Sequence, residues 1–321
     1  MSSKWLVTGA AGFIGSHLCE ALVARGDDVV GVDNFDPFYD RSIKERNLSA
    51  LKGQRGFQLR ELDCADPGLP WEGVTGVLHF AAKAGVRPSL DDPAAYVRGN
   101  VQATVQVLEG ARRAGIRRVV LASSSSVYGD TTPPPFGESA AAITPVSPYA
   151  ASKRAGELMA EAFAHLYGAR IANLRYFTVY GPRQRPDLAI HKFTAAIARG
   201  KSIRMFGDGS TERDYTYVAD AVDGTLAALD WTGRNGAPES RPFNIGGGGR
   251  VRLDRLIALI GEALGIAPRI ERAPLQAGDV VLTAADLSRS AAELGYRPKV
   301  GIDAGIRKFV TWYEGTYGHQ S

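Results

Sequence analysis

The chain has 321 residues, of which 45% are apolar and 22% are charged. These proportions are typical of a globular protein of one large or two modest domains, and they exclude collagen, coiled coils and long disordered tracts. The formal net charge of +4 is spread along the chain, which argues against a nucleic-acid surface and favours a small anionic ligand.

The two cysteines give no sign of a disulfide framework or a metal site. Cys19 falls in an expected helix and Cys64 near the end of an expected strand, without a CxxC pattern or a histidine cluster beside either. No apolar run approaches the roughly 20 residues that a membrane span needs, and a signal cleavage would destroy the N-terminal glycine motif. We therefore expect a cytoplasmic protein that binds no metal and no membrane.

The first half of the chain alternates short apolar strands with longer amphipathic helices. The expected strands are Lys4–Val7, Asp28–Val32, Phe57–Glu61, Val77–Ala81, Arg118–Ser123 and Ala169–Arg175. They lack polar alternation, which indicates burial on both faces. The expected helices, each followed by a glycine, are Phe13–Arg25, Ala94–Ala114 and Ser152–Tyr167. This alternation predicts an α/β fold with a doubly wound parallel sheet.

The pattern becomes less regular in the second half. Shorter strands such as Ile203–Phe206 appear, and four consecutive glycines occupy Gly246–Gly249. We expect residues 1–177 to form a nucleotide-binding Rossmann domain and residues 178–321 to form mainly a smaller α/β part. Segments near residues 215–245 are expected to return to the first domain, so the boundary is not a single cut.

A glycine motif joins the first expected strand to the first expected helix. Gly9, Gly12 and Gly15 have the spacing that lets a backbone turn tightly and lets a pyrophosphate approach the positive end of a helix. Asp33 ends the second strand, where a carboxylate can accept both hydrogen bonds from an adenosine ribose. Its charge disfavours a 2′-phosphate, so the motif predicts NAD rather than NADP.

A second motif places acid/base groups together. Tyr149 and Lys153 are four residues apart and therefore share a helix face. A free tyrosine titrates near 10, and a neighbouring cation together with a positive nicotinamide would lower its pKa into a useful range. Ser123–Ser126 follows an apolar strand and so lies at the carboxyl end of the sheet, where such folds bind ligands. These residues predict proton transfer at a substrate hydroxyl.

With these motifs the sequence resembles the extended short-chain dehydrogenase/reductases of the sugar-nucleotide epimerase type, over nearly the whole chain. The matching segments are the glycine motif, Asp33-Asn34, Asp63, His79–Ala82, Asn100, Ser123–Gly129, Tyr149 to Lys153, Arg175–Phe177, Arg213–Tyr215 and Gly295–Pro298. Three further features are similar to UDP-glucuronate 4-epimerases: Asp33–Asp40 with Lys44, Ala84–Ser89, and Thr178.

The resemblance implies roles for individual residues. Tyr149, Lys153 and Ser124 are the implied catalytic residues. The implied NAD contacts are Gly9, Gly12, Phe13, Ile14, Gly15, Asp33, Asn34, Lys44, Asp63, Cys64, Ala81, Ala82, Lys83, Asn100, Ser123, Tyr149, Lys153 and Tyr176. The implied contacts with a UDP-sugar are Arg87, Ser124, Ser125, Ser126, Thr178, Arg185, Arg204, Met205, Phe206, Arg213 and Asp279. The second part of the chain then binds substrate, and a homodimer forms through Ala94–Ala114 and Ser152–Tyr167.

The expected activity is NAD-dependent 4-epimerisation that interconverts UDP-glucuronate and UDP-galacturonate through a transient 4-keto sugar. Ser125, Ser126 and Thr178 would hold the C6 carboxylate with neutral hydroxyls. Two alternatives stay open, a UDP-glucose 4-epimerase of broad specificity and a non-catalytic NAD-binding scaffold. A dehydratase is disfavoured because related dehydratases carry Asp-Glu where this chain has Ser125-Ser126.

Overall fold

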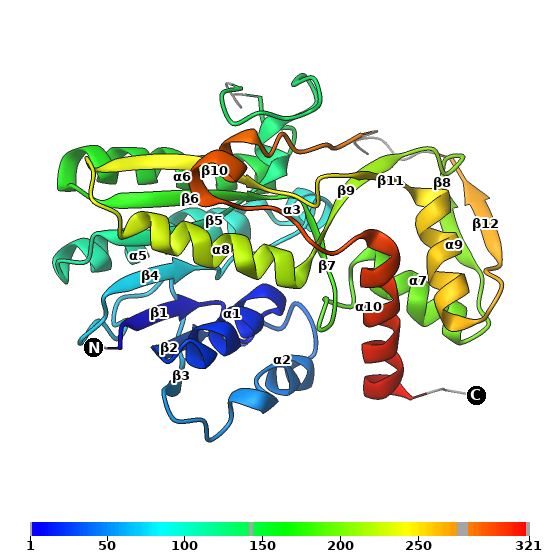
Figure 1. The fold of residues 1–321 in the computed structure, drawn as a ribbon, viewed down its shortest axis with the longest axis horizontal. Coiled ribbons are helices and arrows are strands. Elements are labelled where there is room, and N and C mark those ends of the chain that lie inside the picture. The colour runs from blue at the N-terminus through cyan, green and yellow to red at the C-terminus, as the bar shows by residue number, and fades with distance from the viewer. Residues whose placement is uncertain (1, 141–143, 275–281, 319–321) are drawn as a thin grey trace.

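A parallel sheet of seven strands forms the centre of the computed structural model, which describes residues 2–140, 144–274 and 282–318 (Figure 1). Its strand order is β10-β6-β5-β4-β1-β2-β3. The strands are β1 (Lys4–Thr8), β2 (Asp28–Asp33), β3 (Phe57–Glu61), β4 (Gly76–His79), β5 (Arg118–Ser124), β6 (Arg170–Tyr176) and β10 (Glu239–Ile245). The order reverses between β1 and β4, so a ligand crevice is expected at the carboxyl ends of these two strands.

Helices cover both faces of this sheet. Helix α1 (Phe13–Ala24) packs against α8 (Val218–Thr232) on one face, and α5 (Ala103–Arg113) packs against α6 (Pro148–Tyr167) on the other (Figure 1). Successive residues of β1 enter different cores: Trp5 lies in the first cluster of buried side chains and Leu6 in the second. The predicted doubly wound α/β sheet is therefore confirmed.

The prediction of burial on both faces is wrong for β3. Its last four residues are exposed. The strand lies at the edge of the sheet and pairs only with β2. Its apolar residues, Phe57 and Leu59, are too few to have distinguished an edge strand from a central one.

Two helix boundaries also differ from expectation. The segment expected as one helix over Ala94–Ala114 is divided into α4 (Pro93–Tyr96), a π-helical turn at Val97–Gln102, and α5. The Thr104 hydroxyl donates to the Asn100 carbonyl at 2.6 Å, inside the stretch where the hydrogen-bond pattern changes. Helix α6 begins at Pro148, earlier than expected, because the Ser147 side chain caps Ala150 N–H and Pro148 suits the first turn.

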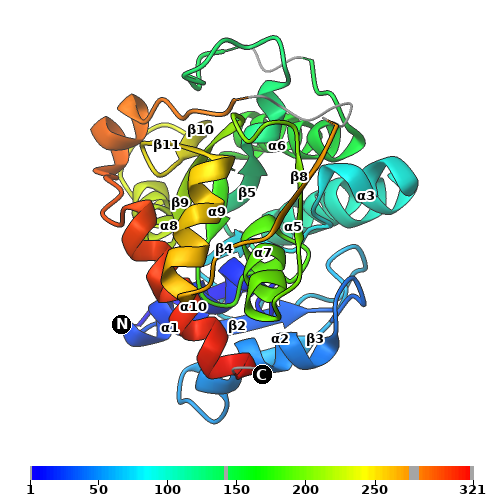
Figure 2. The same cartoon turned by 90° about the vertical axis from the view of Figure 1, so that its right-hand side faces the viewer.

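The C-terminal half contributes two small sheets and three longer helices beside the carboxyl end of the main sheet (Figure 2). The added strands are β7 (Thr178–Tyr180), β8 (Ile203–Phe206), β9 (Glu212–Tyr217), β11 (Arg250–Arg252) and β12 (Ile270–Ala273). The added helices are α7 (Ala189–Ala198), α9 (Leu253–Leu264) and α10 (Ile302–Tyr317); the short helices α2 (Arg41–Asn47) and α3 (Val86–Asp91) belong to the first half. Strand β8 matches its expected range.

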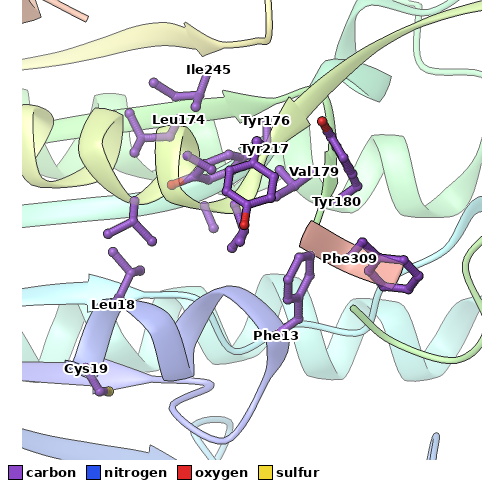
Figure 3. Packing of buried hydrophobic residues seen from close by; sticks show 14 of the residues in the cluster. Phe13, Leu18, Cys19, Leu174, Tyr176, Val179, Tyr180, Tyr217, Ile245 and Phe309 are labelled. Atoms are coloured by element: carbon purple, nitrogen blue, oxygen red, sulfur yellow. The ribbon is translucent and has the colours of Figure 1, made fainter. Parts of the chain in front are cut away.

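One hydrophobic cluster joins the two halves. It contains Phe13 of α1, Tyr180 of β7, Tyr217 of β9 and Phe309 of α10 (Figure 3). Gly305 leaves space for Tyr180, since a Cβ at Gly305 would lie only 1.9 Å from the Tyr180 hydroxyl. This packing fixes the end of β7 relative to α1, which follows the glycine loop.

Candidate active site

The glycine loop is tightly packed and has no room for side chains. A Cβ at Gly15 would lie 2.1 Å from the carbonyl oxygen of Gly9, and one at Gly9 would lie 2.7 Å from the Ala81 nitrogen. Gly9 also has φ of +72°, which favours glycine. Helix α1 starts at Phe13 without a side-chain cap at Gly12, so its first N–H groups remain available to a ligand. This cradle fits the pyrophosphate of a dinucleotide.

The loop opens onto a cavity of about 600 Å³ at the carboxyl ends of the central strands. Most of the expected site residues line this one cavity. They are Gly9, Gly12, Phe13, Ile14, Gly15, Asp33, Asn34, Lys44, Asp63, Cys64, Ala81, Ala82, Lys83, Ser123, Ser124, Ser125, Ser126, Tyr149, Lys153, Tyr176, Thr178 and Arg185. The structure thus brings together the glycine loop, the serine loop and the Tyr/Lys pair.

Asp33 is buried and already accepts three hydrogen bonds. Its Oδ1 accepts from Phe35 N at 2.8 Å and from Lys44 Nζ at 3.0 Å, and its Oδ2 accepts from Ala11 N at 3.1 Å. A carboxylate has about four lone-pair directions, so about one remains for a ligand. Asp33 therefore keeps accepting capacity for a ligand, with the Lys44 ammonium beside it.

Lys83 forms a second bridge at the mouth of the cavity. Its ammonium lies 3.0 Å from Asp36 Oδ2, which ties the loop after β4 to the loop after β2. The backbone of Lys83 is held by Asn100, whose Oδ1 accepts from Lys83 N at 2.7 Å and whose Nδ2 donates to Lys83 O at 3.0 Å. Asn100 also donates to Ser152 Oγ at 2.8 Å. It does not line the cavity, so its effect there runs through Lys83 and α6.

The acid/base residues converge at the start of α6. Burial raises the pKa of Tyr149, while a hydrogen bond with Ser124 and the charge of Arg185 act to lower it. Ser124 Oγ in turn accepts from Ser126 N at 3.2 Å and from Ser126 Oγ at 3.0 Å. Ser124 and Arg185 are therefore groups that favour the ionised phenol in this structure.

The Lys153 side chain is tied to the neighbouring strand β5 in this structure. Its ammonium donates to the Ala122 carbonyl of β5 at 2.9 Å. Burial lowers the pKa of Lys153 to about 8, and the charge of Glu157 acts against this shift. An ammonium in this state is protonated at neutral pH and loses its charge in the mildly alkaline range.

Sequence reasoning missed several residues in the cavity or packed against its lining. Tyr96 packs edge-on against Tyr149, with ring centroids 6.2 Å apart, and donates to the Ala84 carbonyl at 2.9 Å. Arg98 lines the cavity and pairs with Asp63 at 3.0 Å. Phe38 lies under the Arg185 guanidinium at 5.5 Å. Phe38 falls in the segment Asp33–Asp40 that carried the family resemblance, but Tyr96 and Arg98 had no recognisable signal.

The expected substrate contacts divide into two groups. Thr178 and Arg185 line the cavity, and Arg185 is held by Asp187 through two hydrogen bonds of 2.9 and 2.8 Å. The other group does not line it: the Arg87 and Arg204 guanidinium groups lie over the Phe206 ring at 5.7 and 5.6 Å. Met205 of β8 is buried. Arg213 Nη1 donates to the Glu212 carbonyl at 3.0 Å. Asp279 lies outside the described residues.

The described residues contain neither a candidate metal centre nor a candidate membrane span. Within residues 2–140, 144–274 and 282–318, no group of three or more His, Cys, Asp or Glu side chains is placed to hold a metal ion. Over the same ranges, no helix has both the length and the apolar character required to cross a membrane.

Comparison with known proteins identifies the family. A model of the NAD dependent epimerase/dehydratase family matches residues 5–246. UDP-glucuronate 4-epimerase 2 of Arabidopsis thaliana is 42% identical over 330 positions, which cover 97% of this chain and 76% of that protein.

Solved structures agree with this match. UDP-glucuronic acid 4-epimerase from Bacillus cereus, in complex with UDP-glucuronic acid and NAD, has a TM-score of 0.90 at 34% identity and covers 98% of this chain and 100% of its own. UDP-glucose 4-epimerase from Thermotoga maritima, with UDP-glucose, has a TM-score of 0.86 at 32% identity and covers 98% and 99%. The chain belongs to the NAD dependent epimerase/dehydratase family.

Proposed function

We propose that this protein is an NAD-dependent isomerase that interconverts UDP-glucuronate and UDP-galacturonate by epimerisation at C4. The observation that carries the proposal is the shared cavity: Tyr149, Ser124 and Lys153 line it together with the glycine loop, Ser125 and Thr178, and Ser124 is hydrogen-bonded to Tyr149. The similarity to UDP-glucuronate 4-epimerases over 97% of the chain supports the choice of substrate.

In this proposal, Tyr149 and Ser124 transfer the proton of the substrate's 4-hydroxyl. Tyr149 removes the proton of the 4-hydroxyl, and Ser124, which is hydrogen-bonded to it, holds the 4-oxygen and relays the proton. The Lys153 charge keeps the phenol oxygen ionisable. NAD supplies the oxidising and then the reducing equivalent, so it is regenerated in each cycle. The transient 4-keto sugar turns over within the cavity before the proton returns.

The remaining residues are assigned to the dinucleotide or to the UDP-sugar by their place along the cavity. We assign the dinucleotide to the lining between Gly9 and Asp63, with Tyr176 and Ser123 at its nicotinamide end. Residues 1–177, with the segments near residues 215–245 that supply α8 and β10, form the NAD-binding part, and residues 178–321 form mainly the UDP-sugar part. The Phe206 ring with Arg87 and Arg204 supplies an aromatic surface and two cations for the uridine diphosphate.

We also propose a homodimer in the cytoplasm. Apolar side chains are exposed along one side of α6 and the π-helical turn next to α5; they are Val97 at 58%, Leu158 at 48%, Met159 at 38% and Leu166 at 65% exposed. Sedimentation at twice the chain mass of 34.3 kDa tests the dimer. Both cysteines are free and buried, which suits a reducing compartment.

The cofactor preference rests on the charge of Asp33. We expect Asp33→Asn to raise the affinity for NADP relative to NAD by at least about tenfold, because the substitution removes the negative charge and leaves the Lys44 ammonium free to attract a 2′-phosphate. Calorimetric titration of cofactor-free protein with both dinucleotides measures the ratio. Asp36→Asn, which changes a carboxylate in the same loop, is the control and should keep the parental ratio. An unchanged ratio in Asp33→Asn would reject the role given to Asp33.

The hydroxyl of Thr178 should matter for a uronate and not for a hexose. Oxidation at C4 of a uronic acid gives a β-keto acid, which loses CO₂ readily unless its carboxylate is held near the carbonyl plane. We expect Thr178→Ala to lower turnover of UDP-glucuronate by about tenfold, the loss of one hydrogen bond to a charged group, and to leave any turnover of UDP-glucose nearly unchanged.

Product analysis by NMR with both substrates measures this difference. Thr211→Ala, on a residue outside the cavity, is the control. Equal losses for the two sugars would show that Thr178 does not recognise the carboxylate. Efficient epimerisation of UDP-glucose by the parent, without activity on the uronate, would move the assignment to a UDP-glucose 4-epimerase.

A further inference from the structure

A buried carboxylate lies behind the proposed active site. Glu157, one turn beyond Lys153 on α6, is 2% exposed. Its Oε1 accepts from Ser123 Oγ at 2.6 Å and from Arg175 Nε at 2.9 Å. Its Oε2 accepts from Arg175 Nη2 and from Arg154 Nη1, both at 2.9 Å. These four hydrogen bonds use all the accepting directions of the carboxylate.

Glu157 joins the helix that carries the acid/base pair to two neighbouring strands. Ser123 of β5 and Arg175 of β6 are partners in the sheet register, and the next pair is Ser124 with Tyr176, both of which line the cavity. The hydrogen bond from Lys153 to Ala122 O makes a second tie between α6 and β5. The two ties come from residues four apart, so they share one helix face.

We propose that Glu157 is a positioning residue for the 4-epimerisation, which holds Ser123 and the adjoining Ser124 in place and sets a carboxylate one turn from Lys153 on the same helix face. The inference rests on the proposed function for the reaction, whereas the hydrogen bonds of Glu157 are features of the chain itself. Nothing in the sequence patterns pointed to this residue.

The groups around Lys153 show how Glu157 affects the pKa of this lysine. Tyr149 and Glu157 lie on the same helix as Lys153. The Ala122 carbonyl of β5 accepts the hydrogen bond of the Lys153 ammonium. The charge of Lys153 acts on the pKa of His79 of β4, and the charge of Glu157 acts on the pKa of Lys153. Burial lowers the pKa of His79 to about 3, so this imidazole is neutral and does not oppose Lys153. Glu157 is the group whose charge raises the pKa of Lys153 against the effect of burial.

A purely structural role is the competing explanation. In that explanation, Glu157 only neutralises the buried charge of Arg175. Loss of Glu157 would then lower the stability of the fold and leave the pKa of Lys153 unchanged. A polar cavity of about 190 Å³ borders Arg154, Glu157 and Arg175. Its volume and polar lining allow water to hydrate a neutral replacement of Glu157, which favours folding of the Gln variant.

The test compares three variants of the NAD-loaded protein with the parent. Glu157→Gln removes the charge and keeps the shape. Glu157→Gln/Arg175→Met removes both charges. This double variant should fold even if the single variant unfolds because its buried arginine has lost its partner. Arg154→Gln is the matched control, because it removes a charge from the same network at its half-exposed rim and leaves Glu157 ionised. Protein labelled with ¹³C at lysine Cε gives the titration midpoint of Lys153 by NMR, and product NMR gives the pH profile of UDP-glucuronate turnover.

In both Glu157 variants we expect the Lys153 midpoint, and the alkaline limb of turnover with it, to move down by about one pH unit. In Arg154→Gln neither should move down. A parental Lys153 midpoint in both folded Glu157 variants would overturn the inference. If the parent does not turn over UDP-glucuronate at all, the proposed function fails, and the Lys153 titration still decides the effect of Glu157.

Discussion

Replacement of Tyr149 by Phe is expected to lower turnover of UDP-glucuronate by about 10³-fold or more, while the UDP-sugar still binds. Loss of a general acid/base typically lowers rates by about 10²–10⁴, and here oxidation at C4 also depends on the removal of the hydroxyl proton. The Phe ring keeps the packing against Tyr96, whose centroid is 6.2 Å away, so the fold should be preserved. Initial rates by product NMR and calorimetric titration with UDP-glucuronate measure the two effects separately.

The matched control is Tyr96→Phe. It removes a buried hydroxyl that donates to the Ala84 carbonyl and keeps the same ring contact with Tyr149. We expect its turnover to stay within about tenfold of the parent, the effect of one neutral hydrogen bond. Turnover of Tyr149→Phe near the parental rate would reject Tyr149 as the acid/base, and equal losses in the two variants would point to packing instead.

A second large effect is expected at the glycine loop. Gly15→Ala places a Cβ 2.1 Å from the Gly9 carbonyl oxygen and 2.8 Å from the Gly9 carbonyl carbon, and neither atom belongs to a flexible side chain. The backbone that approaches the pyrophosphate must therefore move. We expect the affinity for NAD to fall by at least about 100-fold, equivalent to about 2.8 kcal/mol, together with a lower melting temperature.

Gly315→Ala supplies the control for this substitution. Gly315 lies in α10, and a Cβ there would meet no atom within 4 Å. Alanine has a higher helix propensity than glycine by about 0.8–1.0 kcal/mol, so this variant should bind NAD like the parent and melt slightly higher. Calorimetry and thermal unfolding measure both properties. Parental affinity for NAD in Gly15→Ala would show that the loop does not receive the pyrophosphate.

Local sequence patterns predicted the parts of this molecule that depend on the backbone. Gly9, Gly12 and Gly15 are required by close backbone contacts, and the contacts are found where the spacing placed them. Tyr149 and Lys153 lie in one helix, and their four-residue spacing puts them on one face of it. The core strands were recognisable because burial on both faces requires continuous apolar character.

The features that were not predicted depend on contacts between distant segments. Position at the edge of the sheet, as for β3, is set by strand order and not by the composition of the strand. The three donors to Asp33 come from Ala11, Phe35 and Lys44, so the number of positions left for a ribose cannot be read from Asp33 alone. Glu157 resembles any polar residue of a helix until Ser123 and Arg175 are placed against it by the sheet register.

The most direct test of the central claim is to incubate the purified protein with UDP-glucuronate and follow sugar products by NMR and NADH by absorbance at the same time. We expect UDP-galacturonate to form over many turnovers, with little UDP-pentose and without accumulation of NADH, because the cycle is redox-neutral and the C6 carboxylate is held. NADH formed in proportion to product would indicate a dehydrogenase, and a UDP-pentose as the main product would contradict the account of Ser125, Ser126 and Thr178.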